Sequence, residues 1–242
     1  MAVARLTLSA GLVPAGVAMC GVRLPVNADA ALTALEALGE SSACTPLPVR
    51  LTGAVASRRA SFLAGRWCAH EALRASVPDA AETAIGMGEF REPLWPAGTL
   101  GSIAHTAGYA LAATAPLGHV RAIGVDVERW LDDDAPARLG ADLAGTGELD
   151  ALIAQTGWPA ARLLTMLFSA KESIYKCLFP DVRAFFGFEA ARLERVETAD
   201  GAEGRFVARL AGALSPDLPA GFVLRGRFVC LNDVVVTTLV LE

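Results

Sequence analysis

Apolar residues recur at helical spacing in several stretches of the chain. The stretches with this pattern are 30–40, 58–76, 147–156 and 160–178. Ser57 is the expected N-cap of the second helix, and Pro180 is expected to end the fourth. The Gly- and Asp-rich segment that begins at Asp132 predicts a loop.

A strand with two carboxylates on one face is predicted over 122–130. Apolar residues in this segment alternate with Gly124, Asp126 and Glu128, which is the period of a half-buried strand. Successive side chains of a strand point to opposite faces. Asp126 and Glu128 are therefore expected to point the same way.

Each half of the sequence contains one long predicted helix and several predicted strands. The segment 102–115 predicts a strand, a turn and a second apolar element. The chain after residue 188 is rich in strand-forming residues separated by Gly, Pro and Asp turns. The expected fold class is α+β, with two similar α+β lobes over 1–118 and 119–242.

Composition places the chain among folded proteins. Of the 242 residues, 53% are apolar and 19% are charged, so the chain can bury a core. No run reaches the roughly 18 to 20 uninterrupted apolar residues that a membrane span needs. Residues 1–21 weakly imitate a signal peptide, but Ser9, Gly11 and Pro14 interrupt them, and a buried strand is the better interpretation.

The net charge limits the possible partners. Lys and Arg number 21 and Asp and Glu number 26, so the net charge is −5, the wrong sign for coating nucleic acid or an anionic membrane. Any bound anion must therefore meet a local basic patch. The five cysteines are widely spaced without a CxxC pattern, which predicts free thiols in a reducing, cytoplasmic compartment.

The first candidate for chemistry is the pair Asp126 and Glu128. One or two carboxylates hold Mg²⁺ well and leave positions for substrate phosphates. The three histidines are too scattered to form a metal cage, so metal ligands are expected to be carboxylates. The alternative is a solvated strand face, on which paired acids are common.

The second candidate is the segment Phe168–Lys176. Glu172 and Lys176 are neighbours four apart on a helix, which by itself predicts a surface ion pair. Lys171 falls near the middle of the apolar stripe, where a charge needs a partner or an opening onto a cleft. That placement favours a functional role.

The third candidate is a set of basic and polar residues. Its members are Arg58, Arg59, Arg66, Arg91, Ser102 and His105. Each one alone is explained more simply as a solvated arginine or a structural residue. Together they offer guanidinium groups suited to phosphate recognition in an otherwise acidic chain.

Three segments, in this order, resemble the 4′-phosphopantetheinyl transferase superfamily, and within it the enzymes similar to component D of enterobactin synthetase. The segments are PLWPAGTLGSIAHTAGYA (93–110), AIGVDVERW (122–130) and LFSAKESIYKCLF (167–179). A helix motif of these enzymes, Arg-Arg-x-x-Phe-x-x-x-Arg, matches Arg58-Arg59 through Phe62 to Arg66.

This resemblance implies a holo-[acyl-carrier-protein] synthase type of enzyme. Such enzymes transfer the phosphopantetheine arm of coenzyme A to a serine of acyl or peptidyl carrier proteins and release adenosine 3′,5′-bisphosphate. The resemblance also implies a pseudo-twofold pair of lobes with the active site in the cleft between them. Carriers of siderophore, nonribosomal peptide, polyketide or fatty-acid synthesis are expected partners, and two lobes fused in one chain predict a monomer.

The resemblance also assigns roles to the candidate residues. Asp126, Glu128 and Glu172 are expected to hold Mg²⁺ on the pyrophosphate, and Glu172 to take the proton from the carrier serine. Lys176 and Lys171 are expected to neutralise the phosphates. The nucleotide end of coenzyme A is expected to contact Arg58, Arg66, Ser102 and His105, with Arg59 in the same patch by helix geometry.

Two positions depart from the family pattern. Arg91 lies two residues before Pro93 instead of directly before it, and Val127 cannot ligate a metal, so water is expected to complete the coordination. Two other functions stay open at this point. One is a non-catalytic module that binds coenzyme A or a carrier protein, and the other is a Mg²⁺-dependent phosphodiesterase that uses water.

Overall fold

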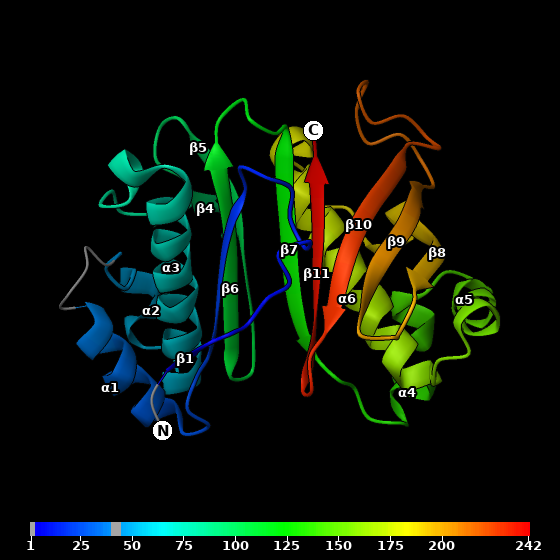
Figure 1. The fold of residues 1–242 in the computed structure, drawn as a ribbon, viewed down its shortest axis with the longest axis horizontal. Helices are drawn as coiled ribbons and strands as arrows, with labels where there is room; N and C mark the ends of the chain where they lie inside the picture. Colours follow the sequence, from blue (N-terminus) through cyan, green and yellow to red (C-terminus); the bar gives the residue numbers. More distant parts are fainter. Residues whose placement is uncertain (1–2, 40–44) are drawn as a thin grey trace. The chain divides into compact units, whose positions relative to one another are not determined.

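A computed structural model describes residues 3–39 and 45–242 of the chain. The chain divides into two compact units, one up to Ile123 and the other Gly124–Leu241, whereas the sequence predicts a boundary at residue 118. Each unit combines one main β-sheet with one long helix (Figure 1). The predicted α+β class with two sheet-bearing halves is confirmed.

The first unit is built on a four-stranded antiparallel sheet in the order β1-β2-β6-β5. Its strands are β1 (Ala4–Arg5), β2 (Ala18–Arg23), β5 (Thr99–Thr106) and β6 (Tyr109–Pro116). Helix α3 (Ala56–Ser76) packs on β2, β5 and β6, and α1 (Ala28–Gly39) packs on α3 (Figure 1). Small side chains fill most of β6, so the long helix can approach the sheet closely.

Shorter elements complete this unit. They are α2 (Val49–Thr52), the 3-10 helix η1 (Pro78–Ala80) and a two-stranded sheet of β3 (Gly86–Met87) and β4 (Pro93–Leu94). The turn between β5 and β6 contains Gly108 at a φ of 79°, a left-handed conformation that favours glycine. This hairpin confirms the predicted strand, turn and second apolar element.

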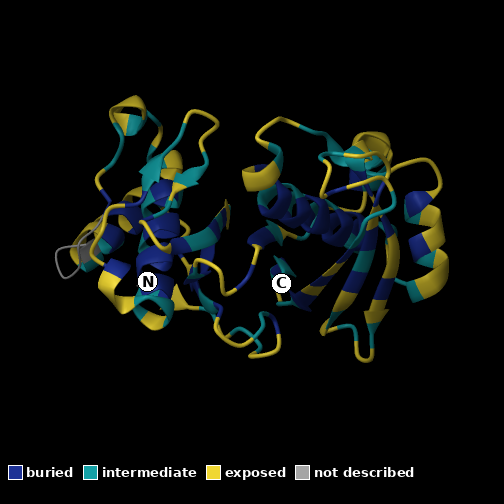
Figure 2. Cartoon of the chain, turned by 90° about the horizontal axis from the view of Figure 1, so that it is seen from above, coloured by how far each residue is buried: buried dark blue, intermediate teal, exposed yellow. Residues whose placement is uncertain are grey.

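The second unit is built on a five-stranded sheet in the order β7-β11-β10-β9-β8. Its strands are β7 (Ala122–Arg129), β8 (Ala191–Thr198), β9 (Glu203–Leu210), β10 (Val223–Cys230) and β11 (Val234–Leu241). Its helices are α4 (Ala135–Leu143), α5 (Glu148–Thr156), α6 (Ala160–Val182) and the 3-10 helix η2 (Phe188–Ala190). Helix α6 packs on β11 and β8, and most of its length is buried (Figure 2).

Two predicted helix ends are wrong. Ser57 lies inside α3, whose N-cap is Val55 and makes no side-chain cap bond. Pro180 lies inside α6 instead of ending it. A proline so close to the end of a helix removes only one of the last backbone hydrogen bonds. The helix stops where Arg183 adopts a left-handed conformation and donates its N–H to the carbonyl of Phe179 at 2.8 Å.

The predicted loop after β7 is wrong in part, because it contains α4. Pro136 lies in the first turn of this helix, where its missing N–H costs no intrahelical bond. Free thiols are found at Cys20, Cys68, Cys177 and Cys230, and Cys44 lies outside the described residues. Within the described ranges, no helix is both long and apolar enough to cross a membrane.

Candidate active site

Strand β7 carries the two predicted metal-binding carboxylates. Asp126 is buried, with 2% of its surface exposed, and Glu128 is half-buried. The apolar residues that alternate with them are buried, as the sequence pattern predicts. Both carboxylates therefore belong to one face of β7.

Helix α6 lies against this strand because Gly124 has no side chain. A Cβ atom at Gly124 would lie 1.9 Å from the carbonyl oxygen of Ser173 and 2.6 Å from the backbone N of Cys177. Real Cβ atoms do not approach other atoms so closely, so only glycine fits here. The close approach brings Glu172 and Lys176 of α6 into the neighbourhood of Asp126.

These three side chains form an incomplete ion-pair cluster. Lys176 Nζ donates to Asp126 Oδ1 at 2.5 Å and lies 4.0 Å from Glu172 Oε2. Asp126 Oδ2 is buried and has no hydrogen-bond partner among the residues that the structure describes. A buried carboxylate oxygen without a donor is costly in a folded protein. Glu172 and Lys176 are thus paired, as their spacing predicts, but Lys176 is closer to the buried Asp126 and the two do not form an isolated surface pair.

The charges of the cluster change the pKa values of Glu172 and Lys176. Burial raises the pKa of Glu172 above its ordinary value, Lys176 opposes the rise and Asp126 adds to it. Burial alone would lower the pKa of Lys176, but the negative charges of Asp126, Glu172 and Glu128 outweigh burial and raise this pKa. Lys176 is therefore a cation, and three carboxylates lie near enough to influence it.

The donor set suits a hard cation such as Mg²⁺. Carboxylate oxygens are its preferred protein ligands. The orphaned oxygen of Asp126 is a natural ligand atom, and the nearby acids Glu128 and Glu172 supply further oxygens. Across residues 3–39 and 45–242, however, no group of three or more His, Cys, Asp or Glu side chains is arranged to hold a metal. The residue types therefore suit Mg²⁺, although the side chains are not arranged as a complete set of metal ligands.

Lys171 occupies a different environment from Lys176. It is 3% exposed, and its Nζ donates to Glu148 Oε2 at 2.8 Å and to the carbonyl of Leu143 at 3.0 Å. The partner that a charge in the apolar stripe demands is thus Glu148, which the sequence analysis missed. Glu148 lies in the first turn of α5, which packs against α6, and neither its burial nor this packing can be predicted from the local sequence pattern. The phosphate contact of Lys171 stays a prediction.

Arg66 of α3 is a buried cation in the first unit. Its guanidinium donates to the carbonyls of Ile85 and Gly86, both at 2.9 Å, and lies 4.6 Å from the ring centre of Phe62. Burial lowers the pKa of Arg66 to about 10, so it is charged at neutral pH. No carboxylate in the described part of the chain forms an ion pair with it.

The other predicted phosphate ligands are placed unequally. Arg58 and Arg91 are exposed, and Arg91 has a positive φ of 67°. Arg59 is half-buried, and within the described ranges its Nε has no hydrogen-bond partner. Ser102 is buried and His105 is exposed; being three apart on β5, they point to opposite faces of the sheet. The structure therefore does not bring Ser102 and His105 together.

Each unit also has a cavity near its candidate residues. In the first unit, an open cavity of about 630 Å³ is lined by residues that include Thr45, Phe62, Gly86 and Met87. Arg66 holds one wall of this cavity, because it binds the carbonyl of Gly86. This cavity gives a small ligand space beside a buried cation.

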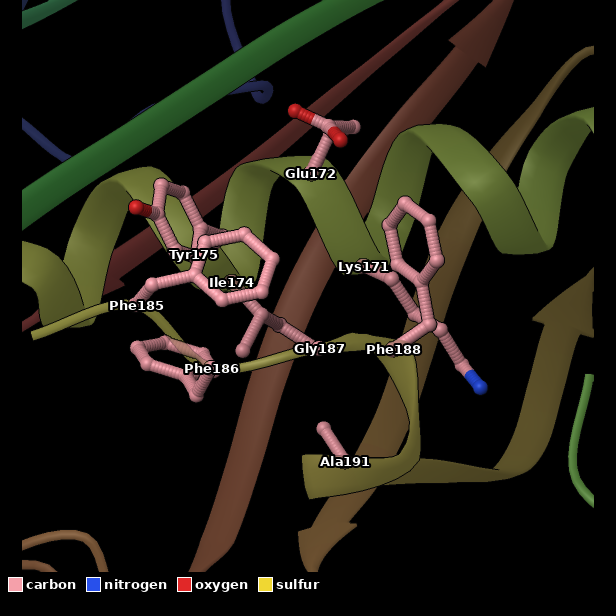
Figure 3. A pocket seen from close by; sticks show the side chains of 9 residues that line it. All are labelled: Lys171, Glu172, Ile174, Tyr175, Phe185, Phe186, Gly187, Phe188 and Ala191. Carbon is pink, nitrogen blue, oxygen red and sulfur yellow. The ribbon is translucent and has the colours of Figure 1, made fainter. Parts of the chain in front are cut away.

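In the second unit, a cavity of about 190 Å³ lies beside Glu172. Figure 3 shows Tyr175, Phe185, Phe186 and Phe188 around this cavity, between α6 and the segment that precedes β8. The rings of Tyr175 and Phe186 are 4.9 Å apart, centre to centre. An apolar wall therefore adjoins the charged cluster.

Comparison with known families gives matches in both units. Residues 47–115 match the 4′-phosphopantetheinyl transferase N-terminal domain, and residues 122–218 match the 4′-phosphopantetheinyl transferase superfamily. The two matches contain the arginine helix and the carboxylate cluster, respectively.

Individual relatives agree with these matches. The 4′-phosphopantetheinyl transferase PptT of Mycobacterium tuberculosis is 33% identical over 231 residues, which cover 90% of this chain and 96% of the relative. The 4′-phosphopantetheinyl transferase Npt of Nocardia iowensis is 35% identical over 159 residues, or 64% of this chain and 69% of the relative. Enterobactin synthase component D of Salmonella typhimurium is 38% identical over 144 residues, or 60% and 58%. This chain belongs to the 4′-phosphopantetheinyl transferase superfamily.

Proposed function

We propose that this chain transfers the 4′-phosphopantetheine arm of coenzyme A to a serine of acyl or peptidyl carrier proteins. A bond forms between the serine Oγ and the phosphorus that bears pantetheine. The bond from that phosphorus to the bridging pyrophosphate oxygen breaks, and adenosine 3′,5′-bisphosphate leaves. The observation that carries this proposal is the cluster of Asp126, Glu172 and Lys176 with one orphaned carboxylate oxygen.

Asp126, Glu128 and Glu172 are proposed to hold a Mg²⁺ ion. When bound, the ion would offset negative charge on the pyrophosphate and on the leaving phosphate. The oxygen of Asp126 that lacks a donor supports this assignment, because a cation would satisfy it.

Glu172 is the proposed acceptor for the proton of the carrier serine, directly or through one water. Burial raises its pKa above the ordinary value of a glutamate, and a cation bound at the same carboxylate would oppose this rise. Lys176 carries the positive charge that would stabilise the phosphates as the bond breaks. Lys171 would act on the phosphates only after release from Glu148.

The residues of the first unit are proposed to hold the nucleotide end of coenzyme A. Arg66 is a buried cation that binds the carbonyl of Gly86, a residue that lines the cavity, and Arg59 has a buried donor without an acceptor among the described residues. Both features favour an anionic ligand such as the 3′-phosphate. Arg58, Arg91, Ser102 and His105 stay candidate contacts of the same ligand.

The aromatic cavity beside Glu172 is proposed to accept the pantetheine arm. This arm carries a dimethyl group and a chain of methylenes, and Tyr175, Phe185 and Phe186 present apolar surface to it. Its position next to Glu172 would hold the reacting end of the arm near the proton acceptor.

Transfer to carriers is tested by incubating the protein with coenzyme A, Mg²⁺ and an apo carrier, and measuring the intact mass of the carrier. The expected result is the addition of one phosphopantetheine group, lost on chelation and restored by Mg²⁺. A panel of siderophore, peptide, polyketide and fatty-acid carriers would define the range of partners.

The same experiment separates the alternative functions. Tight binding of coenzyme A with no modified carrier would identify a binding module. Release of adenosine bisphosphate without any carrier would identify a phosphodiesterase. We expect a cytoplasmic monomer, and the size of the protein in solution tests the monomer.

A further inference from the structure

We propose that Glu148 is a positioning residue for the transfer, acting through Lys171 to fix the rotation of helix α6. This inference rests on the proposed function, because it concerns how Glu172 and Lys176 are held for that reaction. Glu148 lies outside the three motifs that carry the family resemblance.

Every oxygen of Glu148 is used. The residue is 1% exposed, and Oε2 accepts from Lys171 Nζ at 2.8 Å and from the N–H of Gly145 at 2.6 Å. Oε1 accepts from the N–H of Leu193 at 2.6 Å. One carboxylate therefore joins α6, the loop between α4 and α5, and strand β8.

Lys171 completes the connection on the other side. Its ammonium also donates to the carbonyl of Leu143 at 3.0 Å, the last residue of α4. The pair thus fixes one side of α6 to two helices and a strand. On another side, α6 presses on β7 at the glycine Gly124. The helix is held from two directions at Lys171 and Ser173.

This anchor lies next to the catalytic side chains. Lys171 directly precedes Glu172, and successive residues differ by about 100° around an α-helix. Figure 3 shows the two side chains leaving α6 in different directions. A rotation of α6 that released Lys171 would turn Glu172 and Lys176 relative to Asp126 on β7.

Stability alone is a weak reason for a buried ion pair. Apolar residues of similar volume often stabilise a protein as well or better, because both charges must lose their water. An ion pair adds geometric specificity, because each of its hydrogen bonds requires a defined arrangement of donor and acceptor. Glu148 and Lys171 are placed to fix in this way the orientation of the helix that bears Glu172 and Lys176.

The first experiment is Glu148→Gln in the full chain, with kcat and KM for coenzyme A measured well below the unfolding temperature. The expected result is a loss in kcat of about 10- to 100-fold, as for other residues that orient active-site groups, with KM within about twofold. The matched control is Glu194→Gln, which makes the same change in an exposed pair with Arg209 and should leave kcat unchanged.

The second experiment removes both charges with Glu148→Gln and Lys171→Met together. The double variant leaves no buried ammonium without its carboxylate partner, so stability should recover relative to Glu148→Gln. If the pair positions α6, kcat stays low at recovered stability, and backbone amides of 169–178 exchange faster than in the unaltered chain.

Three results would overturn the inference. They are an unchanged kcat in folded Glu148→Gln, a kcat that recovers together with stability in the double variant, and a rise in KM alone. The third would mean that Lys171 serves as a phosphate ligand. If the unaltered chain modifies no carrier, the proposed function fails, and amide exchange in the variants still tests the anchor.

Discussion

The two units carry unmatched charges of opposite sign. In the first, Arg66 is 5% exposed and bound only to the carbonyls of Ile85 and Gly86, with no carboxylate partner in the described part of the chain. In the second, Asp126 is 2% exposed and has one oxygen bound to Lys176 and one without a donor. Among the described residues, the buried Arg66 of the first unit thus lacks an anionic partner, and the buried Asp126 Oδ2 of the second unit lacks a donor or cation.

This difference separates buried charges that are paired within the protein from buried charges that are not fully paired. Lys171 and Glu148 are as deeply buried as Arg66 and Asp126, yet their charges are matched and every oxygen of Glu148 is bonded. Burial alone therefore does not mark a ligand-binding residue. Asp126 differs from the Lys171–Glu148 pair in having one buried oxygen without a donor among the described residues, which a folded protein bears only at a cost.

The sharpest way to break the comparison is Asp126→Asn. The amide keeps the shape of the side chain but loses the negative charge, so cation binding fails. Since a bound metal contributes several kcal/mol to such reactions, kcat/KM should fall by about 10³-fold or more. Intact mass of the carrier over time measures the loss. Titration with Mg²⁺ should show that no concentration restores the rate.

The control for this variant is Asp132→Asn. Asp132 is an exposed acid bound to Arg138, with both oxygens at 3.0 Å from one guanidinium nitrogen. The same chemical change there should leave transfer unaffected. Comparable rates for Asp126→Asn and Asp132→Asn would show that the orphaned oxygen has no role in the reaction.

Much of the carboxylate site follows from local sequence. Alternation along 122–129 determines that Asp126 and Glu128 share a face, and helical spacing makes Glu172 and Lys176 neighbours. Helical or strand periodicity says nothing, however, about which elements meet. The contact of α6 with β7 depends on the missing side chain of Gly124, and its close fit appears only in three dimensions.

Contacts between residues far apart in the sequence could not be predicted for the same reason. Lys171 in an apolar stripe predicts some partner, but Glu148 lies 23 residues earlier, on another helix. Arg66 similarly bonds to the backbone at Ile85, where residue type gives no signal. Helix ends were mispredicted because α3 starts without a side-chain cap and α6 tolerates Pro180 near its end.

A smaller effect is expected for Arg66→Lys in the first unit. The lysine keeps the charge but cannot donate to both carbonyls in the plane of a guanidinium, so the cavity wall at Gly86 loses its support. A charged hydrogen bond contributes about 1.5 to 3 kcal/mol, which predicts a rise of about 10- to 100-fold in KM for coenzyme A at nearly constant kcat.

The substrate itself provides a test of what Arg66 recognises. With coenzyme A that lacks the 3′-phosphate, the unaltered protein and Arg66→Lys should have similar KM values if this residue serves the phosphate. Arg74→Lys is the matched control, because Arg74 also lies on α3 but is bound to Glu71 and Glu82. A fall in kcat at constant KM would show that Arg66 acts in catalysis instead of substrate binding, and this result would contradict the proposed difference between the two units.

The smallest expected effect concerns His70, which is buried behind the same cavity. Its Nδ1 lies 2.8 Å from the carbonyl of Ala81 and its Nε2 lies 3.1 Å from Thr45 Oγ1, which accepts the N–H of Ile85. Burial lowers the pKa of His70 below its ordinary value; the carbonyl of Ala81 and Glu82 oppose this, and Arg74 and Arg66 add to it. The folded protein therefore prefers the neutral ring.

The sign of the pH effect follows from this preference. Above about pH 6.5 both folded and unfolded states hold a neutral ring, and the contribution of His70 to stability is complete. As pH falls below that value, the unfolded state takes up a proton first, and stability decreases by at most about 1.4 kcal/mol per pH unit down to the folded pKa.

A domain of this size loses about 2 to 4 °C in Tm per kcal/mol. Thermal unfolding between pH 7 and pH 5 should therefore show a steeper loss in the unaltered protein than in His70→Gln. Parallel curves for the unaltered protein and His70→Gln would mean that folding does not change the pKa of His70, and the preference of the folded protein for the neutral ring would be refuted.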